Sequence, residues 1–336
     1  MSTHRKRRQG MIRKGAYIYG SLLLTMITSI VPVVQAKEFP SQPIRFIVSF
    51  APGGGSDTIA RLLAKPLGEI FGQTVVVENK PGAYGSVAAS QLTQSAPDGY
   101  TLALVTNSTI SGPAALGVKL PYKIPQDFTP ITLVAFTPIV LAVHPSLKVD
   151  SYAEFVELLK RSPKDGHFYG TYGFGSGAHF AGEYMKSHSD VPMTQVPYKG
   201  SGPLANALIA GEVKIGLMEL STAAPFIQSG QIRALVVTSP ERSPNFPDVP
   251  TLSEVGFPTD LPGWYGVVGP KNLPPRVVGT LNEKFQQALN LQDVQQKFSS
   301  MGLIPASSTS AEFENFIDSD IATWKSIAKR SNIEAD

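Results

Sequence analysis

The 336-residue chain contains no cysteine. Disulfides and thiolate metal sites are therefore excluded, and so is a lipoprotein anchor, because that lipid attaches to a cysteine at the mature N-terminus. Charged residues make up only 16% of the chain, and no apolar run beyond the first 36 residues is long enough to cross a bilayer. The sequence predicts a free, soluble protein with room for two domains of ordinary size.

The first 36 residues have the pattern of an export signal. Six Lys and Arg residues between Arg5 and Lys14 form a basic head, and a largely apolar segment follows over residues 16–34. Val34 and Ala36 are the small residues that signal peptidase requires. Small and polar residues interrupt the apolar segment, which disfavours the alternative of a retained anchor. We expect cleavage after Ala36 and a periplasmic product.

Loss of this segment reverses the sign of the net charge. The whole chain has 29 basic and 26 acidic residues, and the part after Ala36 keeps 23 basic residues and all 26 acidic ones. The basicity therefore belongs to the export signal. The sequence predicts no nucleic-acid partner, because the mature chain has no excess of positive charge.

Residues 44–72 have the pattern of a strand, a glycine loop and a helix. Three glycines, Gly53 to Gly55, follow an apolar run and precede Ser56 and Asp57. Such a loop can leave the N–H groups of a new helix open to an anion. The glycines can equally serve only to make a tight turn.

Similar units recur along the chain. Helices that alternate with strands across short loops predict parallel βαβ units with helices on both faces of a sheet. We expect strands at 44–50, 74–78, 100–106, 131–143, 167–172, 193–197, 214–218, 232–238 and 261–268. We expect helices at 56–72, 87–94, 151–161, 178–186, 204–210, 276–289, 293–301 and 311–328, and a loop over 111–128.

Two segments are expected to cross between domains. The apolar stretch 131–143 is too long for one strand and is interrupted at Pro138, and residues 261–268 resemble a return crossing. We predict an α/β fold in which residues 37–138 with 264–336 form domain 1 and residues 139–263 form domain 2. A two-strand hinge would join them, with a ligand cleft between.

Five loops share one design, in which an apolar strand is followed by glycine or small polar residues and then by a helix. Loops at the carboxyl ends of parallel strands share one sheet edge, so we expect all five to face the cleft. Their amides and hydroxyls suit a carboxylate or phosphate on a small solute. The loops are PGGGSD, NKPGAYGS, TNSTISG, GFGSGAH and PYKGSG.

Other chemistries fit the sequence less well. A dinucleotide fingerprint would need a glycine where Thr58 stands, and no Walker lysine follows the triple glycine. Ser176 and Ser56 lack the flanking glycines of a hydrolase elbow. His179 and Glu183 lie four residues apart, but two residues do not make a metal site.

Several single residues have two interpretations each. Asp57 is expected to be a helix cap before it is a ligand contact. Lys199 is either a solvated lysine or a cation facing the cleft, and Glu219 is either an exposed carboxylate or a group that receives a ligand's ammonium or hydroxyl. Trp264 and Tyr265 are expected in the core or the hinge.

The chain resembles the Bug proteins, the periplasmic solute receptors of the tripartite tricarboxylate transporters. The resemblance covers essentially the whole mature length, and it implies a type II periplasmic binding protein fold that closes on one solute, commonly a carboxylate. The matching motifs, in order, are FAPGGGSDTIARLLAKPL, VVVENKPGA, APDGYTLAL, DFTPITLV, YGTYGFGSGAH, VPYKGSGPLANALIAGEV, RALVVTS, ERSPNFPDVPTLSEVGFP and WYGVVGPKNLPPRVVGTLN.

The resemblance also implies where the ligand binds. Residues 50–57 and 81–86 would hold a carboxylate, often through waters, and residues 106–108, 175–179 and 198–200 and Glu219 would meet the rest. Tyr84 and Ser86 depart from the small PGAGGN-type loop of the family, which puts citrate-like specificity in doubt. The expected ligand-binding residues are Phe50, Ala51, Gly54, Gly55, Ser56, Asp57, Ala83, Tyr84, Ser86, Thr106, Asn107, Gly175, Ser176, His179, Tyr198, Lys199, Gly200 and Glu219.

We therefore expect a receptor for an organic acid, an aromatic carboxylate or an amino acid, with no cofactor, no metal and no bond broken. Its partners would be the membrane subunits of a transporter or a sensor kinase, and the chain would be a monomer. One alternative is an exported serine hydrolase using Ser176 and His179. Another is an adhesion or structural protein that binds no small molecule.

Overall fold

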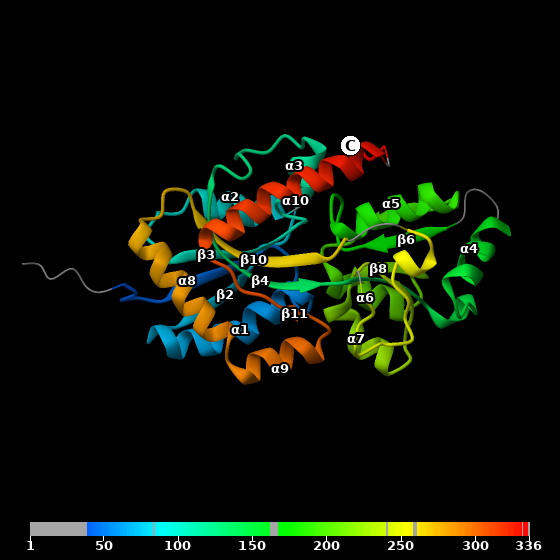
Figure 1. Ribbon diagram of the computed structural model, residues 1–336, viewed down its shortest axis with the longest axis horizontal. Helices are drawn as coiled ribbons and strands as arrows, with labels where there is room; N and C mark the ends of the chain where they lie inside the picture. Colours follow the sequence, from blue (N-terminus) through cyan, green and yellow to red (C-terminus); the bar gives the residue numbers. More distant parts are fainter. Residues whose placement is uncertain are drawn as a thin grey trace, which may run out of the picture. The chain divides into compact units, whose positions relative to one another are not determined.

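The computed structural model describes residues 39–82, 85–161, 167–239, 241–257, 261–330 and 332–334. The predicted signal segment and cleavage site at Ala36 lie outside these residues, as do Ala83 and Tyr84. The described strands form two β-sheets, one of six strands and one of five, and helices pack against both (Figure 1). Both belong to the compact unit Glu38–Asp336.

The six-stranded sheet has the order β11-β4-β10-β3-β1-β2. Its strands β1 and β2, and β1 and β3, pair in parallel, whereas β10 runs antiparallel to both β3 and β4. The strands are β1 (Ile44–Val48), β2 (Val75–Asn79), β3 (Thr101–Thr106), β4 (Phe128–Thr137), β10 (Gly263–Pro270) and β11 (Ile304–Pro305).

Helices cover both faces of this sheet, and together they form what we call lobe 1. Phe46 and Phe285 meet in the core on one face, and Ile47 and Phe313 belong to the core on the other. This two-sided burial explains why β3 is apolar without alternation. The helices are α1 (Gly55–Phe71), α2 (Ser86–Thr93), α3 (Ser111–Leu116), α8 (Pro275–Leu289), α9 (Gln292–Ser300) and α10 (Ser310–Arg330).

The five-stranded sheet has the order β7-β6-β8-β5-β9 and, with its helices, forms lobe 2. Strand β6 pairs in parallel with β7 and β8, and β5 runs antiparallel to β8 and β9. The strands are β5 (Ile139–Val143), β6 (Phe168–Thr171), β7 (Thr194–Pro197), β8 (Ile215–Glu219) and β9 (Arg233–Val237). The helices are α4 (Tyr152–Arg161), α5 (Gly177–Ser189), α6 (Ser201–Ile209) and α7 (Leu220–Gln228).

The chain passes between the sheets at Pro138, where β4 ends and β5 begins. The return passage leads from β9 to β10, and Thr238 ties the two passages together. Its hydroxyl accepts from the Ile139 N–H at 3.0 Å and donates to the Leu261 carbonyl at 3.0 Å. The α/β fold with two crossings is thus confirmed, while the domain boundaries at 138/139 and 263/264 stay predictions.

Helix α10 forms a further link between the lobes. Phe313 and Ile317 pack on the six-stranded sheet, and Trp324 meets Phe180 of α5 with ring centroids 4.4 Å apart. In Figure 1 this helix, drawn in red, extends from lobe 1 toward α5. None of the described helices has the length and apolarity needed to span a membrane.

The structure differs from the sequence-based expectations in two places. Residues 111–128 were expected to be loop, but α3 occupies Ser111–Leu116. The short edge strand β11 was not expected at all. Helix α3 escapes the sequence pattern because Gly112 and Pro113 are weak helix formers and its six residues show no period. Contacts with α10 supply the stability that the local sequence lacks.

Asp320 of α10 holds that contact together. Its carboxylate accepts hydrogen bonds from Trp264 Nε1 at 2.7 Å, Trp324 Nε1 at 3.0 Å and Ser111 Oγ at 2.5 Å. Burial raises the pKa of Asp320, and these three donors oppose the rise. One side chain therefore joins β10, α3 and α10.

Replacing Asp320 by alanine leaves two indole N–H groups and a hydroxyl without their acceptor. We expect Asp320→Ala to lower the free energy of unfolding by about 3 kcal/mol, measured by urea denaturation. Asp318→Ala is the matched control, because Asp318 is exposed on the same helix. Equal stability of the two variants would contradict the role given to Asp320.

Candidate functional site

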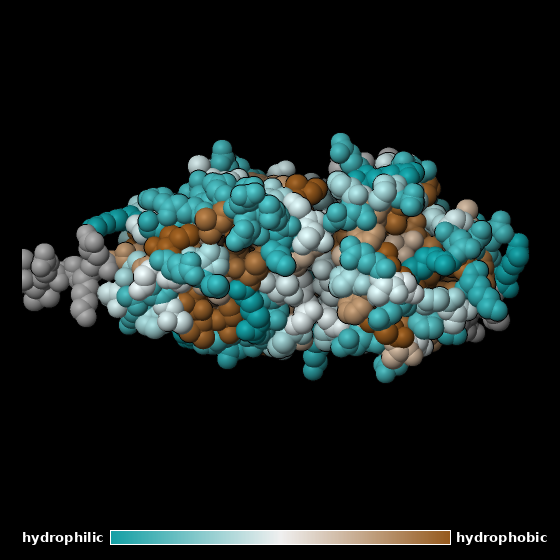
Figure 2. Space-filling view, turned by 90° about the horizontal axis from the view of Figure 1, so that it is seen from below, coloured by the Kyte–Doolittle hydropathy of each residue, from teal (hydrophilic) through white to brown (hydrophobic). Residues whose placement is uncertain are grey.

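A cavity of about 210 Å³ lies between loops of the two lobes. Lobe 1 contributes the ends of β1 and β3 and the turn before α2, and lobe 2 contributes the loops after β6 and β7. Residues near the middle of the hydropathy scale, drawn white, gather across the middle of the face in Figure 2. The cavity is lined by Ser49, Phe50, Gly82, Gly85, Ser108, Tyr172, Gly173, Phe174, Pro197, Tyr198 and Lys199.

Hydroxyl groups lie at and behind the lobe 1 side of the cavity, where Ser49 is part of the lining and Thr109 is not. Ser49 and Thr109 are buried, and neither hydroxyl has a hydrogen-bond partner among the described residues. Both lie close to Gly85, where an added Cβ would be 2.9 Å from Thr109 Oγ1 and 3.1 Å from Ser49 Cβ. A buried hydroxyl without a partner is costly, so these groups call for water or a ligand oxygen.

The other walls are aromatic, and one cation stands at the edge. Phe50 packs edge-on to Tyr172 of lobe 2 with centroids 6.3 Å apart, and Phe174 tilts over His179 at 4.6 Å. Lys199 is exposed and is the single charged residue among the described residues that line the cavity. The site therefore combines a mostly apolar body, several hydroxyls and a positive charge at the rim.

A main-chain hydrogen bond crosses the cleft. The Ala51 N–H donates to the Lys199 carbonyl at 3.2 Å. Next to it, an added Cβ at Gly200, whose φ is +122°, would be 3.3 Å from Phe50 Cβ. The two lobes are therefore in contact, and the cleft is closed along this line.

The start of α1 lies behind the cavity wall. Gly54, Gly55, Ser56 and Asp57 are all buried and none lines the cavity. The expectation that Asp57 caps the helix needs correction, because Gly54 is the N-cap and Asp57 is the third helical residue. The Asp57 carboxylate instead accepts from the Gly53 N–H at 3.0 Å, which closes the loop onto the helix.

Asp57 is also held by Arg61, whose Nε donates to it at 2.9 Å. Burial alone would raise the pKa of Asp57, but the bonds from Arg61 and from the Gly53 N–H outweigh it and leave the pKa below the usual range. The carboxylate is thus ionised and fully engaged inside lobe 1. It is not presented to the cavity.

Glu219 lies at the junction of the lobes, at the end of β8. It is 4% exposed, and burial raises its pKa to about 7. Tyr172 and Tyr265 are buried beside it, and burial and the Glu219 charge raise the pKa of both hydroxyls. The alternative of an exposed carboxylate at this position is therefore wrong.

Ser176 and His179 do not form a nucleophile and base pair. Ser176 is the N-cap of α5, and its hydroxyl accepts from the His179 main-chain N–H at 3.2 Å and donates to the Gly173 carbonyl at 2.5 Å. The His179 ring accepts from the Gly175 N–H at 3.1 Å. The serine hydroxyl thus serves the backbone of its own loop.

The remaining expected residues are placed as follows. Phe50, Tyr198 and Lys199 line the cavity, whereas Thr106 and Asn107 are buried below it. Thr106 Oγ1 and Asn107 Oδ1 both accept from the Ser108 N–H. Ser86 begins α2, while Ala83 and Tyr84 lie outside the described residues.

Sequence reasoning missed part of the lining. Ser49 and Tyr172 were counted as strand, whereas Gly173, Phe174 and Pro197 lie in loops that were expected to face the cleft but were not named as ligand-binding residues. A signal for Ser49 and Tyr172 was present, since they directly follow β1 and β6. Trp264 and Tyr265 are buried in β10, as expected.

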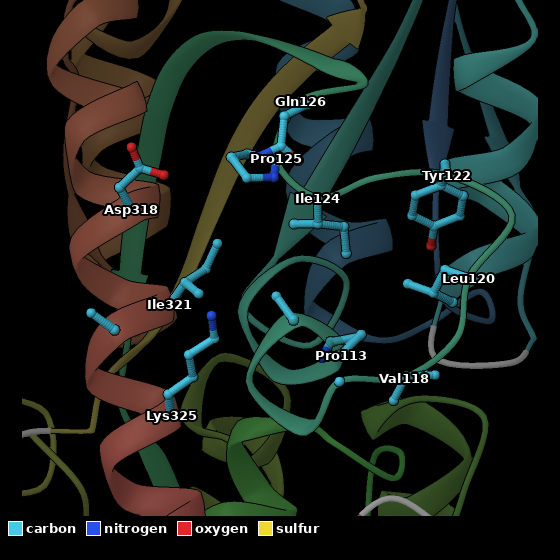
Figure 3. A pocket seen from close by; sticks show the side chains of 13 residues that line it. Pro113, Val118, Leu120, Tyr122, Ile124, Pro125, Gln126, Asp318, Ile321 and Lys325 are labelled. Atoms are coloured by element: carbon cyan, nitrogen blue, oxygen red, sulfur yellow. The ribbon is translucent and has the colours of Figure 1, made fainter.

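A second cavity of about 500 Å³ lies between the loop after α3 and helix α10 (Figure 3). Its walls combine apolar side chains with polar ones, among them Asp318 and Lys325 on α10 and Tyr122 on the loop. No residue expected at the binding site lines it. Within the described ranges, no group of three or more His, Asp or Glu residues could hold a metal ion.

A family model matches residues 59–333 of this chain, and its description is "Tripartite tricarboxylate transporter family receptor". Among single proteins, the chain is similar to protein BugT of Bordetella pertussis. The two are 35% identical over 303 residues, which cover 89% of this chain and 92% of BugT.

Solved structures give the same picture. The chain is similar to a protein of R. palustris solved with adipate, with a TM-score of 0.83 at 32% identity over 88% of this chain and 99% of that one. It is also similar to MatC from Rhodopseudomonas palustris with bound malate. That TM-score is 0.81 at 30% identity, covering 86% of this chain and 99% of MatC.

The buried Glu219 makes stability depend on pH. Its pKa is about 7 in the fold against 4.5 when exposed. The stability that it contributes is therefore full in acid and is lost as pH rises through about 7. Between pH 5 and pH 8 we expect the unfolding free energy of the wild type to fall by up to about 3 kcal/mol through this group, and Glu219→Gln should abolish that fall.

The control is Glu212→Gln, because Glu212 is an exposed glutamate of the same lobe. It should follow the pH dependence of the wild type. If Glu219→Gln did the same, the carboxyl would not be titrating in this range, and the account of its burial would be wrong.

Proposed function

Since this chain belongs to the tripartite tricarboxylate transporter receptor family, we propose that it is a periplasmic receptor that closes on one small carboxylate-bearing solute. The observation that carries the proposal is the cavity between the lobes, which Ser49 lines and which Thr109 adjoins at Gly85. The buried hydroxyls of Ser49 and Thr109 have no partner among the described residues. Neutral donors of this kind suit a carboxylate oxygen, because they supply hydrogen bonds without a buried counter-charge.

Two relatives support the ligand class. One was solved with adipate and the other, MatC, with malate, and both of these ligands are carboxylates. In this chain the hydroxyls of lobe 1 would receive the carboxylate, and the aromatic walls, Phe50 and Tyr172 among them, would cover the remainder. Lys199 at the rim would attract the anion by charge.

The mechanism is closure of the cleft. A ligand that contacts both lobes binds the closed form more tightly than the open one, and so it shifts the population toward the closed form. The hinge would be the two passages tied by Thr238, with domain 1 at residues 37–138 and 264–336 and domain 2 at 139–263. No step requires a bond to break, so the protein would not be an enzyme.

The remaining parts of the proposal concern the cell. Residues 1–36 would be removed after Ala36, and the receptor would act in the periplasm as a monomer. The closed form would be presented to the membrane subunits of a transporter or to the outer domain of a sensor kinase. A serine hydrolase is not favoured, because the Ser176 hydroxyl is bonded to its own loop and not to the His179 ring.

A binding screen tests the receptor directly. We expect at least one acid among malate, adipate, benzoate and glutamate to raise the melting temperature of the mature protein, because a ligand that binds only the folded form stabilises it. Calorimetry should then give one site per chain. If a broad panel of acids and amino acids left the melting temperature unchanged, the receptor proposal would fail.

The lysine at the rim provides a second test. We expect Lys199→Ala to weaken binding of the best acid about threefold to tenfold, and more at low salt than at high salt, because an exposed charge contributes modestly and is screened. Lys214→Ala is the control, since Lys214 is an exposed lysine of the same lobe that does not line the cavity. Equal affinities of the two variants would remove Lys199 from the site.

A further inference from the structure

The lobes meet through glycines that face backbone atoms of the other lobe. Gly112 is the second residue of α3 in lobe 1, and a Cβ added to it would overlap the carbonyl oxygen of Gly175 in lobe 2. Gly202 is the second residue of α6 in lobe 2, and its added Cβ would lie 2.9 Å from Gly53 C and 3.0 Å from Gly54 N in lobe 1. Two separate contacts thus leave no room for a methyl group.

Local conformation does not explain these two glycines. Neither Gly112 nor Gly202 has a positive φ, and both lie in helices, where alanine is more favourable than glycine. Nor does packing inside the same lobe set the closest contacts, because at both positions the atoms nearest to an added Cβ belong to the other lobe. The nearest atom of lobe 1 to the added Cβ at Gly112 is Asn107 O at 3.6 Å, an ordinary contact.

The glycines opposite them, Gly53 and Gly175, are explained by their backbone conformation. Gly53 has φ +85° and Gly175 has φ +64°, so both are in the left-handed region that favours glycine. Each loop can therefore present bare backbone to the helix opposite. In each contact, one glycine (Gly53 or Gly175) is favoured by its positive φ. The glycine opposite (Gly202 or Gly112) has no positive φ and instead leaves room for the close approach of the lobes.

We propose that Gly112 and Gly202 determine the affinity of the receptor without touching its ligand, because a side chain at either position keeps the lobes from closing. This inference rests on the proposed function for its biological meaning, but the closure that it describes does not depend on any ligand. A methyl group at Gly112 or Gly202 cannot be accommodated by a side-chain rotation, since the opposing atoms belong to the backbone.

The lack of cysteine in the chain allows closure to be measured without a ligand. Ala51 and Lys199 are joined across the cleft by a main-chain hydrogen bond of 3.2 Å, so closure of the lobes brings cysteines at these positions close to each other. In Ala51→Cys/Lys199→Cys, we expect a mild oxidant to form the cross-link. The rate is then measured with Gly112→Ala or Gly202→Ala added.

Each added alanine should slow the cross-link about tenfold or more. Gly279→Ala is the matched control, because Gly279 is an exposed helical glycine of α8 with no atom within 4 Å of an added Cβ. It should leave the rate unchanged. Gly112→Ala and Gly202→Ala should melt at or above the temperature of the wild type, as alanine favours a helix, which separates blocked closure from misfolding.

A cross-link that forms at the parent rate in both Gly112→Ala and Gly202→Ala would overturn the proposal, and so would a parent pair that never cross-links. In the cysteine-free background, both variants should bind malate or adipate, whichever the wild type binds, about tenfold more weakly. If no acid bound the wild type while the cross-link still slowed, the receptor assignment would fail and the closure inference would stand.

Discussion

The close approach of bare backbone across the cleft is the contact on which this structure depends. The Ala51 N–H reaches the Lys199 carbonyl at 3.2 Å, and side chains at the neighbouring glycines would prevent it. Because the backbones touch here, the space left between the lobes shrinks to a cavity of about 210 Å³. The separation of the two sheets and the size of the site are thus set by the same few atoms.

The inner cleft carries little fixed charge. The Asp57 carboxylate is paired with Arg61 inside lobe 1. Glu219, with a pKa of about 7, becomes protonated and uncharged on modest acidification. An ionised Glu219 would repel a carboxylate held nearby, so its elevated pKa favours an anionic ligand. In the proposed receptor, the hydroxyl groups of Ser49 and Thr109 would act as donors in a region where a buried cation would itself be costly to desolvate.

The sequence predicted the elements that have a clear local apolar pattern and missed those that have none. The apolar runs at β1, β3 and β5 are buried on both faces of their sheets, which is the condition that produces such runs. Helix α3 lacks any such pattern, and it is held by Ser111 bonding to Asp320, 209 residues along the chain. No window of local sequence contains that information.

The candidate site shows the same division. Loop positions at strand ends follow from the α/β pattern, and so Tyr198 and Lys199 could be named in advance, whereas Phe50 was implied only by the family resemblance. Which residue of a loop faces the cavity is decided by the turn that follows it. Ser176, for example, turns inward because α5 needs its hydroxyl as an N-cap, whereas Phe174, two residues earlier, is left to line the cavity.

Phe50 shows how closure is shared between the protein and its ligand. It follows β1 in lobe 1, yet it packs in the core cluster of lobe 2 and is only 8% exposed. Opening the lobes would return this side chain to water at a cost of about 1.5–3 kcal/mol. A ligand shifts the equilibrium only by its difference in affinity between the two forms, so contacts such as Phe50 lower what the ligand itself must supply. The same contacts raise the fraction of ligand-free protein that is closed. A tighter lobe interface therefore increases affinity but reduces the change in closed fraction that the ligand can produce.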